Sequence, residues 1–222
     1  MAQNLVGLLD LRTYQPGWSG SFVDRRDHAP GVAQRPQRTP LKGIVLHRIG
    51  DAEHAAVAEG RDVDSIIRFF TQDPEGVATV TMDGSYDSKV PMMEKWRASG
   101  IPAANLARAF VPYAFLIEPS GAVSQMLPLE AVGAHAPGYN QSGIGVAFIG
   151  DFRTDPPTPA QVDSGVAVCV ALLLQNGGSP HAQREVQILG HDETRPTPKL
   201  CPGPNFPLQQ IKQRIMAALP TP

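Results

Sequence analysis

Gly43-Ile-Val-Leu-His47 is a short, continuously apolar run that ends in a histidine. A run of this kind is typical of a buried central strand whose two faces are both covered. Val186-Gln-Ile-Leu-Gly-His191 repeats the pattern near the C-terminus. Each predicted strand therefore presents one histidine at its C-terminal end, which is the edge at which open α/β sheets bind ligands.

The rest of the chain alternates between strand and helix patterns. Pro119-Ser-Gly121 separates two short apolar runs, which is typical of a β-hairpin. Thr158 and Gln161 have the spacing of a capping box around a proline, so a long helix should begin there. The predicted strands cover 113–118, 122–127 and 144–149, and the predicted helices cover 64–71, 158–176 and the stretch from 207 onward. This order predicts an α/β fold, a single domain with a mixed central β-sheet flanked by α-helices.

Length and composition agree with one domain. The chain has 222 residues, of which 42% are hydrophobic, and a formal net charge of -2. This balance gives no reason to expect nucleic acid or a membrane as a partner, and we expect a monomer. No run approaches the length of a membrane span, and the start lacks the basic region of a signal peptide. Residues 1–40, punctuated by prolines, predict an N-terminal extended arm lying on the domain, with a loose tail as the alternative.

The two cysteines occupy different surroundings. Cys169 lies in an apolar run and is interpreted as a buried core residue, whereas Cys201 lies in a polar, proline-rich loop, so no disulfide is predicted. Cys201 follows His191 by ten residues. Two histidines and a cysteine are suitable zinc ligands, and three protein ligands leave a fourth position for water. The alternative is that His47 and His191 are hydrogen-bonded histidines at strand ends.

Five segments, in order along the chain, resemble type 2 N-acetylmuramoyl-L-alanine amidases and peptidoglycan recognition proteins. They are Phe22-Val-Asp-Arg-Arg-Asp-His28 with Leu41-Lys-Gly-Ile-Val-Leu-His47, Pro112-Tyr-Ala-Phe-Leu-Ile-Glu-Pro-Ser-Gly121, Val132-Gly-Ala-His-Ala-Pro-Gly-Tyr-Asn140 with Ser142-Gly-Ile-Gly-Val-Ala-Phe-Ile-Gly-Asp151, Leu189-Gly-His-Asp-Glu-Thr194, and Lys199-Leu-Cys-Pro-Gly-Pro-Asn-Phe206. The resemblance spans residues 22–219 apart from 51–108, and Ala114 departs from the histidine or asparagine that many members carry.

The resemblance implies a role for each matched position. It places one Zn²⁺ per chain on His47, His191 and Cys201. It makes Tyr113 and Lys199 catalytic residues, and His135 and Asn140 substrate-binding residues. Taken without the resemblance, Tyr113 is a strand aromatic, Lys199 a solvated loop residue and His135 a structural residue that holds its glycine-rich loop. Asp192 and Glu193 adjoin a predicted ligand and are interpreted either as its supporting residues or as solvated turn residues.

The resemblance also implies a function. The expected activity is zinc-dependent hydrolysis of the lactyl amide bond between N-acetylmuramic acid and L-alanine in peptidoglycan. Residues 41–222 are the predicted catalytic domain. Residues 73–108 are a predicted insertion in it, either a structural cap or a lid. A phage or prophage endolysin is expected, held in the host cytoplasm until its release to the cell wall. A cytoplasmic amidase that recycles muropeptides and a non-catalytic peptidoglycan-binding module are the alternatives.

Overall fold

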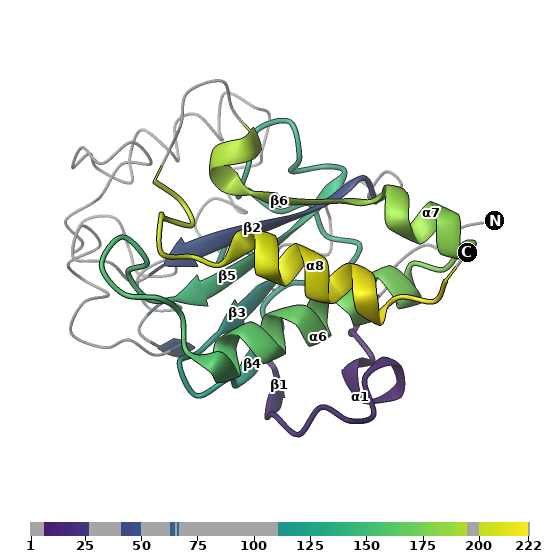
Figure 1. The fold of residues 1–222 in the computed structure, drawn as a ribbon, viewed down its shortest axis with the longest axis horizontal. Helices are drawn as coiled ribbons and strands as arrows, with labels where there is room; N and C mark the ends of the chain where they lie inside the picture. The colour runs from purple at the N-terminus through teal and green to yellow at the C-terminus, as the bar shows by residue number, and fades with distance from the viewer. Residues whose placement is uncertain are drawn as a thin grey trace, which may run out of the picture.

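The computed structural model describes residues 7–26, 41–49, 63, 64, 66, 111–194 and 200–221. These residues form one mixed sheet with helices packed against it (Figure 1). The strands are β1 (Phe22–Asp24), β2 (Gly43–Ile49), β3 (Phe115–Ile117), β4 (Val123–Gln125), β5 (Gly143–Ile149) and β6 (Gln187–Gly190). The helices are α1 (Leu11–Tyr14), α6 (Pro159–Gln175), α7 (Pro180–Glu185), the 3₁₀ helix η4 (His191–Thr194) and α8 (Leu208–Ala218).

The six described strands lie in the order β1-β4-β3-β5-β2-β6. Among them the β3–β4 hairpin is antiparallel and the other neighbouring pairs are parallel, so the predicted mixed sheet is confirmed. The longest of the described strands are the neighbours β2 and β5, which stay in register from Gly43↔Gly143 to Ile49↔Ile149. Both strands are buried along almost their whole length, as their continuous apolar runs require.

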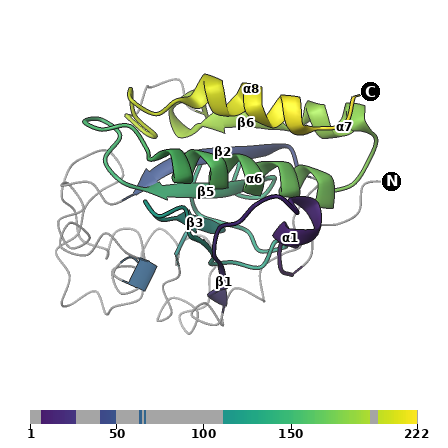
Figure 2. The ribbon, with the colours of Figure 1, turned by 60° about the horizontal axis from the view of Figure 1, so that its bottom comes forward.

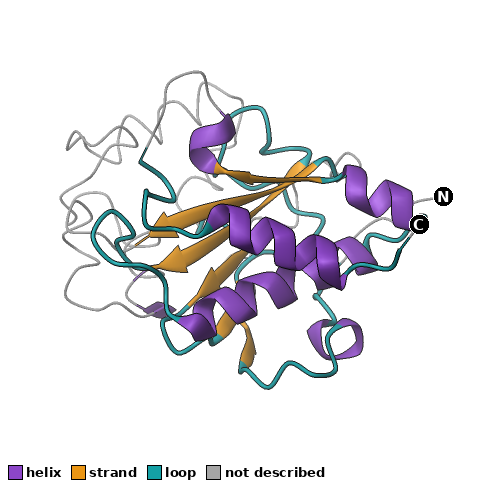
Figure 3. Cartoon of the chain, viewed as in Figure 1, coloured by secondary structure: helices purple, strands orange, loops and turns teal. Residues whose placement is uncertain are grey.

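Helices α6 and α8 lie side by side on one face of the sheet (Figures 2 and 3). Helix α6 begins as predicted, because Thr158 accepts a hydrogen bond from the backbone of Gln161 and the Gln161 side chain accepts one from the backbone of Thr158. Helix α8 buries Ile211 and Ile215 at the spacing of one helical turn. Helix α6 packs against β3 and helix α8 against β6, and the buried apolar residues of both helices belong to the hydrophobic core.

The register of β2 and β5 shows which side chains point away from these helices. Arg48 pairs with Phe148, and the Phe148 ring lies directly under Gly165 of α6, so Arg48 faces the helices. Because successive side chains of a strand alternate between faces, the neighbouring His47 points to the opposite face. The predicted site therefore lies on the face of the sheet that α6 and α8 leave uncovered.

The N-terminal region contains regular structure that the sequence did not predict. Residues 7–26 form α1 and β1, and β1 joins the main sheet beside β4. Leu9 and Leu11 enter the core, and the backbone N–H of Leu9 donates to Oε1 of Gln125. This part of the arm is held to the domain by its own contacts. The short helix α7 was also not predicted.

Two predictions fall on segments that the structure does not describe or describes in part. Of the predicted helix at 64–71, Asp64 and Ile66 are described and both are helical, as is Val63 before them. The predicted insertion at 73–108 lies outside the described residues, so its role as cap or lid stays a prediction. None of the helices that the structure describes has both the length and the apolar character needed to cross a bilayer.

Candidate metal centre

His47, His191 and Cys201 come together at one edge of the sheet. Strands β2 and β6 are parallel neighbours whose pairing ends at Leu46↔Gly190, so the residues that follow, His47 and His191, lie side by side. Their ring centroids are 4.6 Å apart, and Sγ of Cys201 lies 3.8 Å from Nδ1 of His47. One nitrogen or sulfur atom from each residue lies within 4.8 Å of the other two. Within the described part of the chain, no other trio of His, Cys, Asp or Glu side chains is arranged this way.

The arrangement fits a zinc ion in both chemistry and size. Zinc–nitrogen and zinc–sulfur bonds of about 2.0 and 2.3 Å at a tetrahedral angle separate the two donor atoms by about 3.5 Å, close to the Sγ–Nδ1 distance of 3.8 Å. Burial lowers the pKa of His47 well below its usual value of 6.5, and the neighbouring His135 and His191 lower this pKa further. His47 is therefore neutral at pH 7, as a metal ligand must be.

Cys169 has the opposite properties. It is fully buried in α6, and burial raises the pKa of its thiol to about 12. A thiol with that pKa stays protonated and cannot act as a thiolate ligand. Both cysteines are free, in agreement with the prediction that they form no disulfide.

Two hydrogen bonds to its backbone carbonyls hold the loop that carries Cys201. The N–H of Asp192 donates to the carbonyl of Cys201 at 2.8 Å, which ties the loop to the turn that begins at His191. Nε of Arg48 donates to the carbonyl of Leu200 at 2.7 Å, and Nη1 of Arg48 also lies 3.2 Å from Oδ1 of Asp151. Arg48 was not predicted from the sequence, although its place directly after a predicted ligand was a usable signal.

Asp151 connects Arg48 to a second arginine. Arg153 donates to both carboxylate oxygens of Asp151, at 2.8 and 2.7 Å. The hydrogen bond from Arg153 lowers the pKa of Asp151, and the charge of Arg48 contributes to the same shift. Asp151 is therefore ionised at neutral pH and holds the Arg48 guanidinium at the end of β2.

Glu193 supports the other side of the site. Its Oε2 accepts the backbone N–H of Gly190, the last residue of β6, and its two carboxylate oxygens accept from Nζ of Lys212 in α8 at 3.0 and 2.8 Å. Glu193 thereby ties the turn that carries His191 to both β6 and α8. Of the two interpretations offered by the sequence, these contacts favour the supporting one.

The structure places the remaining predicted residues as follows. The ring of Tyr113 is half-buried, with its centroid 5.0 Å from that of His47. Nδ1 of His135 lies 3.1 Å from Nε2 of His47, and His135 is only 3% exposed. Oδ1 of Asn140 accepts the backbone N–H groups of His135 and Ala136 at 2.9 and 2.8 Å. Lys199 lies outside the described residues. The catalytic and substrate-binding roles of these four residues stay predictions.

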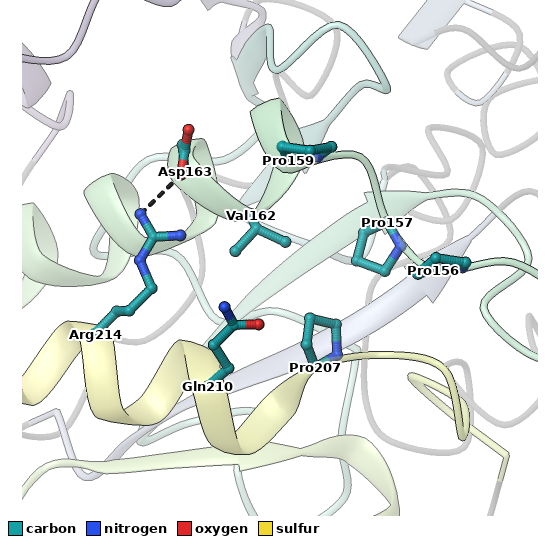
Figure 4. A pocket seen from close by; sticks show the side chains of 8 residues that line it. All are labelled: Pro156, Pro157, Pro159, Val162, Asp163, Pro207, Gln210 and Arg214. Atoms are coloured by element: carbon teal, nitrogen blue, oxygen red, sulfur yellow. Dashed lines mark hydrogen bonds and ion pairs between the residues drawn. The ribbon is translucent and has the colours of Figure 1, made fainter.

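A separate hollow lies on the helical side of the molecule. It has a volume of 260 Å³ and lies between the start of α6 and the start of α8, where Arg214 pairs with Asp163 at 2.7 Å (Figure 4). Its lining consists of Pro156, Pro157, Pro159, Val162, Asp163, Pro207, Gln210 and Arg214. None of the predicted site residues contributes to it, so it is distinct from the candidate metal centre.

The chain is similar to a peptidoglycan-recognition protein and to two phage endolysins. A peptidoglycan-recognition protein of Drosophila melanogaster is 33% identical over 115 residues, which cover 51% of this chain and 59% of that protein. The endolysins of Klebsiella phage KP32 and Escherichia phage T7 are each 34% identical over 98 residues, or 42% of this chain and 59% of theirs. The chain thus spans about three fifths of the length of these relatives.

Two solved structures superimpose on most of this chain. PGRP-SA of Apis mellifera superimposes with a TM-score of 0.51 at 16% identity, covering 86% of this chain and 94% of that one, which supports the fold alone. The amidase LysCS from Clostridium intestinale gives a TM-score of 0.49 at 22% identity, covering 88% and 95%. The family model described as N-acetylmuramoyl-L-alanine amidase matches residues 37–204, a span that contains all three candidate ligands. The chain therefore belongs to the N-acetylmuramoyl-L-alanine amidase family.

Proposed function

We propose that this protein is a zinc-dependent N-acetylmuramoyl-L-alanine amidase that hydrolyses the lactyl amide bond between N-acetylmuramic acid and L-alanine in peptidoglycan. The observation that carries the proposal is the convergence of His47, His191 and Cys201, whose ligand atoms lie within 4.8 Å of one another. These residues would hold one zinc ion. Three protein ligands leave a coordination position open, which distinguishes catalytic zinc sites from structural ones.

The reaction requires few groups beyond the metal. A zinc ion bound there would lower the pKa of its water ligand to about 7 and polarise the scissile carbonyl. In the net reaction the carbonyl carbon gains OH, the C–N bond breaks, and L-alanine leaves with its amine protonated. Tyr113, beside His47, is suited to donate a hydrogen bond to the negative charge that develops on the carbonyl oxygen. Lys199, two residues before Cys201 in the sequence, is suited to stabilise the same charge.

We further propose that the enzyme acts as a phage or prophage endolysin. Two phage endolysins are among its relatives, and they support this role. Peptidoglycan recognition proteins are relatives as well, which keeps a non-catalytic binding module as the second candidate. Tyr113 and the thiol of Cys201 favour the enzyme, because a module that only binds peptidoglycan has no need of a thiolate ligand or of a donor beside the metal. A cytoplasmic muropeptide-recycling amidase would share the chemistry and differ in the size of its substrate.

Mass spectrometry of purified peptidoglycan after digestion tests the activity. We expect peptides with free L-alanine amino termini and glycan strands with intact N-acetylmuramic acid. Binding to peptidoglycan without these products would identify a recognition module instead. Loss of turbidity in cells with a permeabilised outer membrane separates an endolysin from a recycling enzyme, because only the former must cut the intact wall.

Elemental analysis of two cysteine variants tests the metal. Cys201→Ser should lose most of its zinc, since a serine hydroxyl is a poor substitute for a thiolate. Cys169→Ala is the matched control, because it removes the other cysteine, which is buried in α6, and should keep one zinc per chain. Full zinc occupancy in Cys201→Ser would exclude Cys201 as a ligand.

A further inference from the structure

We infer that His135 is a positioning residue for the metal centre: its Nδ1 accepts a hydrogen bond from Nε2 of His47 and so turns Nδ1 of His47 toward Cys201 and His191. The inference rests on the proposed function, since it assumes that His47 binds zinc. It assigns His135 to the support of a ligand, a different role from the substrate contact that the sequence resemblance implies.

The contacts of His47 determine which of its nitrogens serves the metal. Nδ1 of His47 faces the Cys201 sulfur at 3.8 Å, whereas Nε2 lies 3.1 Å from Nδ1 of His135. A nitrogen that binds a metal carries no hydrogen, so a neutral His47 bound through Nδ1 has its hydrogen on Nε2. His47 is then the donor of the 3.1 Å contact and His135 the acceptor. The two rings meet edge to face, at an interplanar angle of 87°.

Two glycines, Gly145 and Gly133, leave the space that the His135 ring occupies. A Cβ on Gly145 of β5 would lie 2.6 Å from Cγ and 3.0 Å from Nδ1 of His135, so only glycine lets the ring rest on the strand there. A Cβ on Gly133 would lie 2.7 Å from Cδ2 of the same ring. Strand β5 pairs with a neighbour on each side, β2 and β3, so the backbone of Gly145 beneath the ring cannot shift easily.

The backbone of His135 is fixed as well. Asn140 accepts the N–H groups of His135 and Ala136 through one oxygen, which closes the turn that carries the histidine. His47 and His135 are 0% and 3% exposed, so water does not compete strongly for the bond between them. The packing of the His135 ring, the hydrogen bonds of its backbone and its burial together direct Nδ1 of His135 toward Nε2 of His47. Partners of this kind set the orientation and tautomer of metal-binding histidines.

Two isosteric variants test the role. His135→Asn keeps a polar atom two bonds beyond Cβ, where Nδ1 stands, whereas His135→Leu places a methyl group there. Zinc dissociation constants from chelator competition and visible spectra of the Co²⁺-substituted proteins are measured for both variants and the wild type. We expect His135→Leu to bind zinc about 10- to 100-fold more weakly and to show an altered Co²⁺ spectrum. His135→Asn should recover most of the affinity.

The outcomes separate this inference from the function it rests on. Equal zinc affinity in the leucine variant and the wild type, or an equal loss in both variants, would overturn the positioning role while leaving the amidase proposal intact. A wild type that binds no zinc would overturn both. NMR of the ring nitrogens in the zinc-loaded wild type needs no variant to fold: we expect the hydrogen of His47 on Nε2, and a hydrogen on Nδ1 would refute the inference.

Discussion

Replacement of Arg48 by leucine should weaken zinc binding without unfolding the protein. The Arg48 side chain is 9% exposed, and its Nε donates to the carbonyl of Leu200, one residue before the predicted ligand Cys201. A hydrogen bond from a charged donor contributes about 1.5–3 kcal/mol. The loss of the Asp151 contact adds little, because Asp151 keeps its hydrogen bonds to Arg153. In the variant, zinc must order the Cys201 loop by itself, so its dissociation constant should rise about 10- to 100-fold.

Zinc titration and thermal unfolding, each on metal-free and loaded protein, check this prediction. The metal-free variant should unfold within a few degrees of the wild type, because leucine fills the same buried position and the lost hydrogen bond to Leu200 fastens the loop that carries Cys201. Arg153→Leu is the matched control: it removes the other arginine on Asp151 but leaves the Leu200 contact in place. A large loss of stability in Arg48→Leu with unchanged zinc affinity would refute the reasoning and leave Arg48 a purely structural residue.

Three further predictions concern chemistry, packing and pH. Tyr113→Phe and Lys199→Ala should keep their zinc but lower the hydrolysis rate, each by about 10²–10³-fold, and wild-type turnover in both would exclude them from the reaction. Gly165→Ala should lower the unfolding temperature, because the new Cβ would lie 2.4 Å from Cζ of Phe148. The overpacking costs about 1–3 kcal/mol, which exceeds the gain in helix propensity of about 1 kcal/mol. A rise in the unfolding temperature would contradict this prediction. Asp151 has a lowered pKa, so its stabilising contribution is present above its ordinary pKa of 3.8 and is lost as the pH falls through the lowered value. In thermal unfolding, the loss of stability caused by Asp151→Asn should therefore shrink in acid. A loss of stability that stays constant with pH would argue against this role of Asp151.

The sequence predicted the parts of the fold that have strong local signals. The apolar runs ending at His47 and His191 became β2 and β6, and the capping box at Thr158 became the start of α6. Strand β1 was missed because three residues are too few to show a period, and no hairpin turn marks it in the way that Pro119-Ser-Gly121 marks the equally short β3 and β4. Its position is set by its pairing with β4, which is about a hundred residues away in the chain and cannot be read from the local sequence.

The candidate site was likewise predictable only where the local sequence carries a signal. Strand ends and residue types made His47, His191 and Cys201 candidates for a metal site, and the family resemblance placed the predicted zinc on them. The contacts that hold them were not predictable, because they join residues far apart in sequence: His135 to His47 across 88 positions, and Arg48 to Leu200 across 152. Gly145 belongs to a motif that was matched from the sequence. Only the structure shows why a glycine is needed there, because a side chain would occupy the space of the His135 ring.

The pairing of β1 with β4 has a consequence for how separate molecules of this protein behave. Ser21 accepts the N–H of Val123, and Arg25 donates to the carbonyl of Gln125, so the N-terminal segment saturates the outer backbone groups of a fully buried strand. Without that segment, the same groups would form an open edge that invites strand-by-strand association and aggregation. Among the described strands β1 is the outermost on this side, and it is only three residues long and ends at Asp24, which is paired with Arg26. A short edge that ends in charge is a poor template for another strand, so we expect a chain that lacks residues 7–26 to associate more readily than the intact chain.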